Sequence, residues 1–222
     1  MATIRTSVAA AAAALALGAT GCATLGSATL FEDEFAEQGV WETASDGDGR
    51  LAYEDGRYRI EVAKAEFELH SYRLWEGSPL DGIAFEVDAE LDGKDGALSV
   101  LCVSSVDEGS ERISPNDRYY DFFILPGTGE WGIAATHTKD EPLVAGQDRE
   151  AIRKDAPNRM RAECESGGEG EPTTLVLHVN DVKVAEHSDA KGFAGFQGVG
   201  LAVWSPEGGT AGLFDNAVAR ER

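Results

Sequence analysis

The sequence predicts an all-β protein in which one antiparallel β-sandwich follows an N-terminal signal peptide. Polar and apolar residues alternate with a period of two along residues 83–91 and again along 175–179, as in strands with one buried and one solvated face. Turn-forming residues separate these and further segments at nearly regular spacing. After Cys22, no apolar pattern of helical period extends over a useful length. Many short strands with frequent turns indicate a sandwich or a barrel.

The chain begins with the layout of a bacterial signal peptide. Arg5 supplies a positive charge, residues 7–17 form an alanine-rich apolar run, and four small residues at 18–21 precede Cys22. The run is too short for a comfortable membrane span. Small residues that end in glycine before a cysteine resemble the bacterial lipobox, whose cysteine is acylated, although Ala19 stands where leucine is commonest. An ordinary secretory signal cut near the same place is the alternative.

The lipobox resemblance divides the chain into a signal peptide over residues 1–21, a lipidated tether over 22–29 and a sandwich domain over 30–222. Two or three acyl chains on Cys22 would anchor the protein firmly, because each buried CH₂ contributes about 0.8 kcal/mol. The membrane is therefore one expected partner. The expected location is the bacterial cell membrane after export, with the domain facing the cell exterior or the periplasm.

The remaining strands are expected between turn sequences along the mature chain. Further runs predict strands at residues 30–35, 50–54, 57–62, 67–72, 97–104, 118–125, 130–136, 158–165, 182–187, 199–204 and 211–219. Turn chemistry separates the strands at residues 54–56, 92–93, 126–127, 180–181 and 207–209. Only residues 148–154 look helical, for one or two turns before Pro157. No internal repeat or Pro/Ser-rich linker interrupts the mature chain, so we expect one domain.

The charge of the chain narrows the classes of partner. Among 222 residues, 40 are acidic and 19 are lysine or arginine, which gives a formal net charge of −21. Phosphate contacts need a clustered basic surface, so nucleic-acid binding is not expected. Acidity mainly favours solubility and discourages contact with anionic surfaces. Because the charges are interspersed with apolar residues, the composition is that of a folded domain.

The three cysteines have different expected roles. If Cys22 carries lipid, Cys102 and Cys164 remain as an even pair, and in an oxidising exported compartment such a pair predicts a disulfide. Two buried free thiols are the alternative. A metal site is disfavoured, because neither cysteine has a CxxC partner or a nearby histidine.

Short segments spread over nearly all of the mature chain match the pattern of one family. They are 31–35 (FEDEF) with Trp41, 53–60 (YEDGRYRI), 85–91 (FEVDAEL), the strand of Cys102, 119–124 with 131–133, 158–165 (NRMRAECE) leading into 175–184 (LVLHVNDVKV), and 214–216 (FDN). Together they resemble exported bacterial concanavalin A-like, laminin G-type domains related to the 3-keto-disaccharide hydrolase domain. The resemblance implies a two-sheet jelly-roll sandwich and supports the Cys102–Cys164 bridge. It says little about chemistry, because this fold hosts lectins, enzymes and adhesion modules.

The sharpest catalytic candidate is the trio Glu86, Asp88 and Glu90. It satisfies the E-x-D-x-E signature of family-sixteen glycoside hydrolases, and alternation places all three carboxylates on one face of a strand. Retaining hydrolysis needs two carboxyl groups about 5–5.5 Å apart, whereas residues i and i+4 of a flat strand lie roughly 13 Å apart. No bulge is suggested here and no tryptophan is adjacent. The pattern therefore favours a half-solvated acidic strand, with a glycoside hydrolase as the alternative.

A ligand-binding site is a stronger expectation than a catalytic one. Sugars are held by aromatic faces flanked by polar groups. Trp75 and Trp131 adjoin glycine-containing loops and are expected to be exposed, whereas Trp41 and Trp204 are expected in the core. The aromatic candidates are Tyr72, Trp75, Tyr119, Tyr120, Trp131 and Trp204, of which Trp75, Tyr120 and Trp131 are favoured.

No cofactor is expected, with Ca²⁺ as the alternative. Asp33 and Asp215 could meet if the terminal strands pair, and residues 46–49 (DGDG) are rich in oxygen ligands but lack the rest of a calcium loop. A solvated acidic loop is the favoured interpretation. The four histidines show no metal-ligand spacing, and His178 is expected to be exposed.

Three functions remain open from the sequence. The favoured one is a membrane-anchored lipoprotein with a non-catalytic sandwich that binds carbohydrate or envelope glycan. The second is a glycoside hydrolase that uses Glu86, Asp88 and Glu90. The third is a structural or adhesion domain that recognises another protein.

Overall fold

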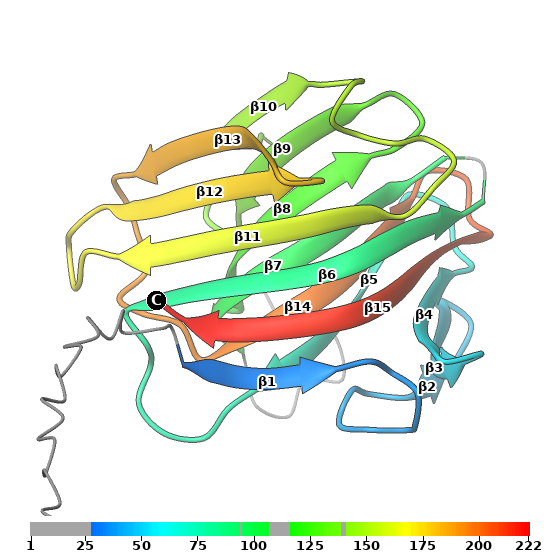
Figure 1. Ribbon diagram of the computed structural model, residues 1–222, viewed down its shortest axis with the longest axis horizontal. Coiled ribbons are helices and arrows are strands. Elements are labelled where there is room, and N and C mark those ends of the chain that lie inside the picture. Colours follow the sequence, from blue (N-terminus) through cyan, green and yellow to red (C-terminus); the bar gives the residue numbers. More distant parts are fainter. Residues whose placement is uncertain (1–27, 94, 107–115, 139–140) are drawn as a thin grey trace, which may run out of the picture.

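The computed structural model describes residues 28–93, 95–106, 116–138 and 141–222, and these residues form two antiparallel β-sheets without a helix. Figure 1 shows the two sheets stacked one over the other. In the described part of the chain, no helix is long and apolar enough to cross a membrane. The antiparallel two-sheet sandwich predicted from the sequence is confirmed. The signal peptide and Cys22 lie outside the described residues.

Sheet A is the larger layer. In spatial order its strands are β13 (Val182–Asp189), β12 (Thr173–Val179), β11 (Asn158–Ser166), β6 (Gly82–Asp92), β15 (Thr210–Glu221), β4 (Arg57–Val62), β3 (Gly49–Glu54) and β2 (Ala44–Ser45). The ninth strand, β1 (Thr29–Asp33), pairs with the end of β15, beyond the part of β15 that pairs with β4. The terminal strands therefore pair, as the sequence allowed.

Sheet B is the smaller layer, and its strands come mainly from the middle of the chain. In spatial order they are β10 (Val144–Gln147), β9 (Glu130–Ala135), β8 (Arg118–Leu125), β7 (Ala97–Ser105), β14 (Gly198–Ser205) and β5 (Phe67–Leu74). β8 and β5 are not neighbours, because β7 and β14 lie between them.

Burial along the strands follows the pleat. In β4, the side chains of Tyr58, Ile60 and Val62 are buried between the sheets, while Arg57 and Arg59 face outward. Each large apolar side chain buried in this way contributes about 1.5–3 kcal/mol. One continuous core fills the space between the sheets, and a second, smaller apolar cluster lies on the outer face of sheet B.

Every segment predicted as a strand overlaps an observed strand, and the errors are confined to short elements. The sequence missed β2 and β10, which have only two and four residues. Residues 148–154 form turns rather than a helix. Asp148 resembles the N-cap residue of a helix, because its Oδ1 accepts hydrogen bonds from the backbone N–H groups of Glu150 and Ala151. The Asp148 carbonyl also accepts from Ile152 N, and the chain then turns into β11.

Two predicted turns have the backbone of tight hairpin turns. Asp55 and Gly56 have φ angles of 52° and 74°, and Asn180 and Asp181 have φ angles of 50° and 66°. Two consecutive left-handed residues match the right-handed twist of the flanking strands. These turns join β3 to β4 and β12 to β13.

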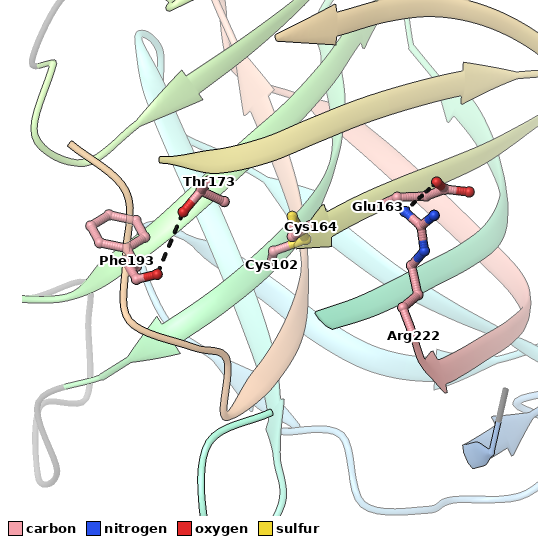
Figure 2. The surroundings of a disulfide bond; sticks show 6 residues. All are labelled: Cys102, Glu163, Cys164, Thr173, Phe193 and Arg222. Atoms are coloured by element: carbon pink, nitrogen blue, oxygen red, sulfur yellow. Dashed lines mark hydrogen bonds and ion pairs between the residues drawn. A yellow bond between two sulfur atoms is a disulfide. The ribbon is translucent and has the colours of Figure 1, made fainter. Parts of the chain in front are cut away.

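Cys102 and Cys164 form the predicted disulfide, which links the two sheets. Cys102 lies on β7 of sheet B and Cys164 on β11 of sheet A, and both are fully buried. Figure 2 shows the bridge with two neighbouring interactions, an ion pair of Glu163 with Arg222 and a hydrogen bond that the Thr173 hydroxyl donates to the Phe193 carbonyl.

The start of β1 and the end of β15 lie side by side. The carbonyl of Ala28 accepts a hydrogen bond of 2.9 Å from Glu221 N, and the carbonyl of Gly82 accepts one of 3.0 Å from Arg222 N. In Figure 1 the C-terminus accordingly lies close to the start of β1.

Candidate functional site

The carboxylates of Glu86, Asp88 and Glu90 lie on the outer face of sheet A, and each has a cationic partner. Glu86 and Asp88 both pair with Arg159 on β11, and Glu90 Oε2 is 2.7 Å from Arg57 Nη1 on β4. Asp88 also accepts a 2.9 Å hydrogen bond from Asn216 Nδ2. The three acids are thus members of a ladder of ion pairs that crosses the sheet.

The strand that carries these acids is regular. β6 pairs with β11 without a shift from Gly82 to Ala89, and the bulge in this region lies on β15, between Asp215 and Val218. Nothing therefore draws Glu86 and Glu90 together along β6. A pocket of about 210 Å³ beside them is lined by Glu86, Arg159, Arg161, His178 and Asp181. In it the two arginines are already paired with acids.

The favoured aromatic candidates belong to the core or its margin. Tyr120 is 0% exposed, and its hydroxyl donates a 2.8 Å hydrogen bond to Asp189 Oδ2, so a ligand cannot reach its ring. Trp75 and Trp131, expected to be exposed, are partly buried and pack against the main core. Trp131 lies over Gly146 of the neighbouring strand. The absence of a side chain at Gly146 leaves room for the Trp131 ring to pack.

Of the two tryptophans predicted in the core, one is buried there and the other is not. Trp41 is buried in the core, as expected. Trp204, expected in the core, is half-buried on the outer face of sheet B, opposite Glu68 of β5 and Ala97 of β7. The apolar run of β14 concealed its alternation, since the inward positions of this strand are Val199, Leu201 and Val203.

Asp33 and Asp215, the alternative calcium ligands, point to opposite sides of sheet A. Asp33 pairs in register with buried Ala217, and its Oδ2 lies 3.7 Å from Arg73 Nη1. Asp215 lies opposite Asp88 in the register of β15 and β6, on the outer face. Within the described ranges, no group of three or more His, Cys, Asp or Glu side chains is arranged to hold a metal ion.

The outer face of sheet B brings together a different set of side chains, which we call the sheet B cluster. Its members share the outward-facing positions of three strands and are Glu68, His70 and Tyr72 of β5, Ser99 of β7, and Tyr119 and Asp121 of β8. Between them, β14 presents two small residues, Gly200 beside Tyr72 and Ala202 beside His70, and then Trp204 beside Glu68. These small residues form the floor of the cluster.

Aromatic rings from non-adjacent strands meet above this floor. A flat sheet would hold β5 and β8 about 14 Å apart, because neighbouring strands are about 4.8 Å apart. The rings of His70 and Tyr119 nevertheless lie edge to face with centroids 5.5 Å apart, and Tyr72 is 6.2 Å from Tyr119. Tyr72 and Tyr119 also pack on the small apolar cluster of Leu101, Val103 and Ala202.

Three polar side chains contact one another in a row along β5. His70 lies between the other two, with Nε2 3.0 Å from Glu68 Oε2 and Nδ1 2.9 Å from Tyr72 Oη. Burial raises the pKa of Glu68, but the adjacent His70 outweighs burial and lowers the pKa below its usual value. Burial raises the pKa of both Tyr72 and Tyr119, so these hydroxyls stay protonated at physiological pH.

The pKa of Asp121, the second acid of the cluster, is shifted upward. Burial, followed by the negative charge of Glu68, raises its pKa to about 7. The nearby Ser99 hydroxyl opposes this shift, but neither Ser99 Oγ nor Asp121 Oδ1, both buried, completes a well-directed hydrogen bond within the described part of the chain. Two carboxyl groups with opposite pKa shifts thus share one face of the sheet, which is a common property of functional sites.

No family model matches the sequence, and no curated protein matches it either. Solved structures do match. A Bacillus subtilis protein of unknown function with a galectin-like fold has a TM-score of 0.63 at 12% identity, over 87% of this chain and 96% of that one. The potassium-bound carbohydrate recognition domain of Emp46p has a TM-score of 0.57 at 11% identity, over 82% and 88% of the two chains. A Bacillus licheniformis β-glucanase has a TM-score of 0.57 at 10% identity, over 86% and 97%.

The fold is a galectin-like, concanavalin A-like jelly roll. At these identities the likeness shows the fold alone, so the jelly roll does not assign a ligand. The predicted jelly-roll class is therefore confirmed, while membership of the 3-keto-disaccharide hydrolase-related family stays a prediction.

Part of the sheet B cluster could have been found in the sequence. The alternation in 67–72 places Glu68, His70 and Tyr72 on one face, and that in 118–125 does the same for Tyr119 and Asp121. Two faces of mixed aromatic and acidic residues are a recognisable signal of a site. What the sequence could not show is that the jelly roll brings these two strands together over a floor of small residues.

Proposed function

We propose that this protein is an exported lipoprotein that binds carbohydrate on the outer face of sheet B. The observation that carries the proposal is the sheet B cluster, in which tyrosine rings, two carboxyl groups and an imidazole share one face. Sugars bind to such combinations because their C–H faces pack on aromatic rings while their hydroxyl groups hydrogen-bond to nearby polar groups. Trp204, on the same face, adds a further half-buried ring.

The opposite face of the molecule is less suited to a sugar. There the acids of β6 pair with Arg57 and Arg159, so a ligand hydroxyl would have to compete with an existing ion pair. In the sheet B cluster, by contrast, the Glu68 carboxylate lies beside His70 rather than an arginine, and 28% of the Glu68 side chain is exposed. An acceptor of this kind gains a hydrogen bond when a donor arrives.

The similar structures support this choice of ligand class. One is named as a carbohydrate recognition domain and another as a β-glucanase. The lipid anchor rests on the sequence alone, in which small residues at 18–21 precede Cys22. An anchored domain with a short tether would act on glycans of the envelope or on glycans that reach the cell surface.

A glycan array probed with the full chain in detergent, with and without Ca²⁺, tests the binding proposal. Glu68→Gln and Glu86→Gln are a matched pair, because each removes one charge from an outward-facing, ion-paired glutamate, one on each sheet. We expect Glu68→Gln to weaken binding at least tenfold and Glu86→Gln to leave it unchanged. The absence of any bound glycan, or the reverse pattern in the two variants, would overturn the proposal.

Membrane fractionation of cells that express the wild type or Cys22→Ser tests the anchor separately. The wild type should partition with membranes and incorporate labelled fatty acid, and Cys22→Ser should do neither. If both proteins remain soluble after export, the anchor is disproved while the binding proposal stands.

Glycoside hydrolysis at the same cluster is a second candidate function, favoured by the opposite pKa shifts of Glu68 and Asp121. A carboxyl group that holds its proton near pH 7 can donate it to a glycosidic oxygen, while an ionised neighbour assists as base or nucleophile. Release of reducing ends from the glycans that bind, lost in Asp121→Asn and retained in Glu86→Gln, would establish this activity. Binding without release would exclude it.

A further inference from the structure

We propose that the sheet B cluster selects sugars without acidic groups, either neutral or amine-bearing, and rejects uronic and sialic acid residues. This inference rests on the proposed function and names its ligand class. It is carried by the charges that face the site and by the hydrogen-bonding groups that the fold leaves open there.

The charged groups of the site are almost all acidic. Glu68 and Asp121 face outward on strands that flank the small-residue floor, and buried Asp117 lies close enough to act on the titration of both site tyrosines. The outward positions of β5, β14, β7 and β8 hold no lysine or arginine in these fully described strands. The basic side chain among these outward positions is His70, which is 2% exposed and already lies beside Glu68.

The exposed acceptor of the cluster favours ligand groups that carry hydrogens. Glu68 has 28% of its side chain exposed, whereas Ser99 Oγ and Asp121 Oδ1 are buried. A sugar hydroxyl or ammonium group can donate to the Glu68 carboxylate. A ligand carboxylate has no proton to donate and would place a third negative charge beside Glu68 and Asp121, which opposes binding.

The rest of the molecule strengthens this preference. A net charge of −21 disfavours the approach of anionic polymers to any face. Arginines do face outward on sheet A, but each of Arg57, Arg59, Arg159 and Arg161 is ion-paired with an acid of the same face. An acidic glycan therefore finds no unpaired arginine among these four.

The test compares ligands that differ only in charge: galacturonate oligomers as free acids and as methyl esters, together with chitosan and N-acetylchitosan oligomers. Titration calorimetry at pH 7 measures their affinities for the full chain in detergent. We expect neutral and amine-bearing oligomers that bind to do so at least tenfold more tightly than any acidic oligomer, and the methyl ester to bind more tightly than its free acid. Raising the salt concentration should narrow the difference, because salt screens the repulsion.

Two single variants test whether the acids of the cluster cause this selectivity. Glu68→Gln and Asp121→Asn should each reduce the discrimination between ester and acid at least threefold, whereas Glu86→Gln on sheet A should leave it unchanged. Equal affinities for the free acid and its ester in the wild type would overturn the selectivity but not the proposed function. Failure of every glycan in the panel and on the array to bind would overturn both.

Discussion

Gly200 lies directly beneath the ring of Tyr72. A Cβ atom built on Gly200 would be 2.8 Å from Tyr72 Cδ1 and 2.9 Å from Leu101 Cδ1, closer than side-chain carbons approach each other in folded proteins. The absence of a side chain at this position therefore lets the rings of the sheet B cluster lie over β14.

Gly200→Ala should displace the Tyr72 ring and destabilise the protein by about 1–3 kcal/mol, the usual cost of inserting a carbon into a packed site. Urea denaturation measures the change. Gly47→Ala is the matched control, because a Cβ there would meet nothing within 4 Å. Equal stability of the two variants would show that the floor is not tightly packed.

Asp121 should make the protein less stable as the pH rises. Its pKa of about 7 in the folded state lies above the value of about 3.9 expected when unfolded. Between these values the folded state binds more protons, so the stabilisation present below pH 4 is lost as the pH rises through 7. We expect Asp121→Asn to flatten this dependence and to be at least about 1 kcal/mol more stable than the wild type at pH 8.

Denaturation curves recorded between pH 4.5 and 8.5 measure this effect. Glu68→Gln serves as a second variant, because removing its negative charge should lower the pKa of Asp121 and move the loss of stability to lower pH. Parallel profiles for the wild type and Asp121→Asn would contradict the assignment.

Glu163 is a buried acid that two arginines and a histidine surround. Its carboxylate pairs with Arg161 and with Arg222, whose Nη1 is 2.5 Å away, and His178 Nε2 lies at 3.9 Å. Glu163→Gln should cost about 2 kcal/mol, as expected for charge-assisted hydrogen bonds. Because burial already lowers the pKa of His178 and Glu163 opposes that shift, the variant should lower this pKa further, which histidine NMR titration measures.

Glu186→Gln provides the control for Glu163→Gln. Glu186 is also paired with a cation, Lys183 at 2.6 Å, but on the exposed surface. Exposed pairs contribute little to stability, so the midpoint of thermal unfolding should not change. A loss as large as that in Glu163→Gln would show that burial is not what distinguishes the two acids.

Reduction of the Cys102–Cys164 disulfide should lower the free energy of unfolding by up to about 4 kcal/mol, because the bridge closes a loop of 62 residues. For a chain of this size, roughly 2–4 °C of melting temperature corresponds to each kcal/mol. Calorimetric melting with and without reductant measures the shift. The Cys102→Ala/Cys164→Ala double variant should not respond to reductant, and an unchanged wild-type melt would contradict the prediction.

Local patterns in the sequence were sufficient to predict the longer strands, two hairpin turns and the cysteine pair, since each depends on the neighbouring residues or on the number of cysteines. The residues that could contact a ligand were harder to predict from the sequence. Tyr120 looked suitable by composition, yet its position in the pleat of β8 turns it inward, while Tyr119 and Asp121 on the same strand face outward. Their meeting with His70 depends on the order β8-β7-β14-β5, which no local pattern encodes.

The three acids of β6 illustrate the same limit. Their spacing matches a catalytic signature, but their chemistry depends on β4 and β11, which supply Arg57 and Arg159 from distant parts of the sequence. A motif read along one strand cannot reveal the cations that its neighbours place beside it.

The hydrogen bond between the Ala28 carbonyl and Glu221 N means that the sandwich begins and ends at the same corner. A few glycine and serine residues could join residue 222 to residue 28, and new ends could be opened in the loop at residues 167–171, which joins β11 to β12. With the proposed lipid-anchor segment placed before the new N-terminus, such a circular permutant would keep both sheets and their pairings but attach to the membrane through another corner. Comparing glycan capture by cells that carry the two forms would reveal whether the proposed attachment point orients sheet B for access from outside.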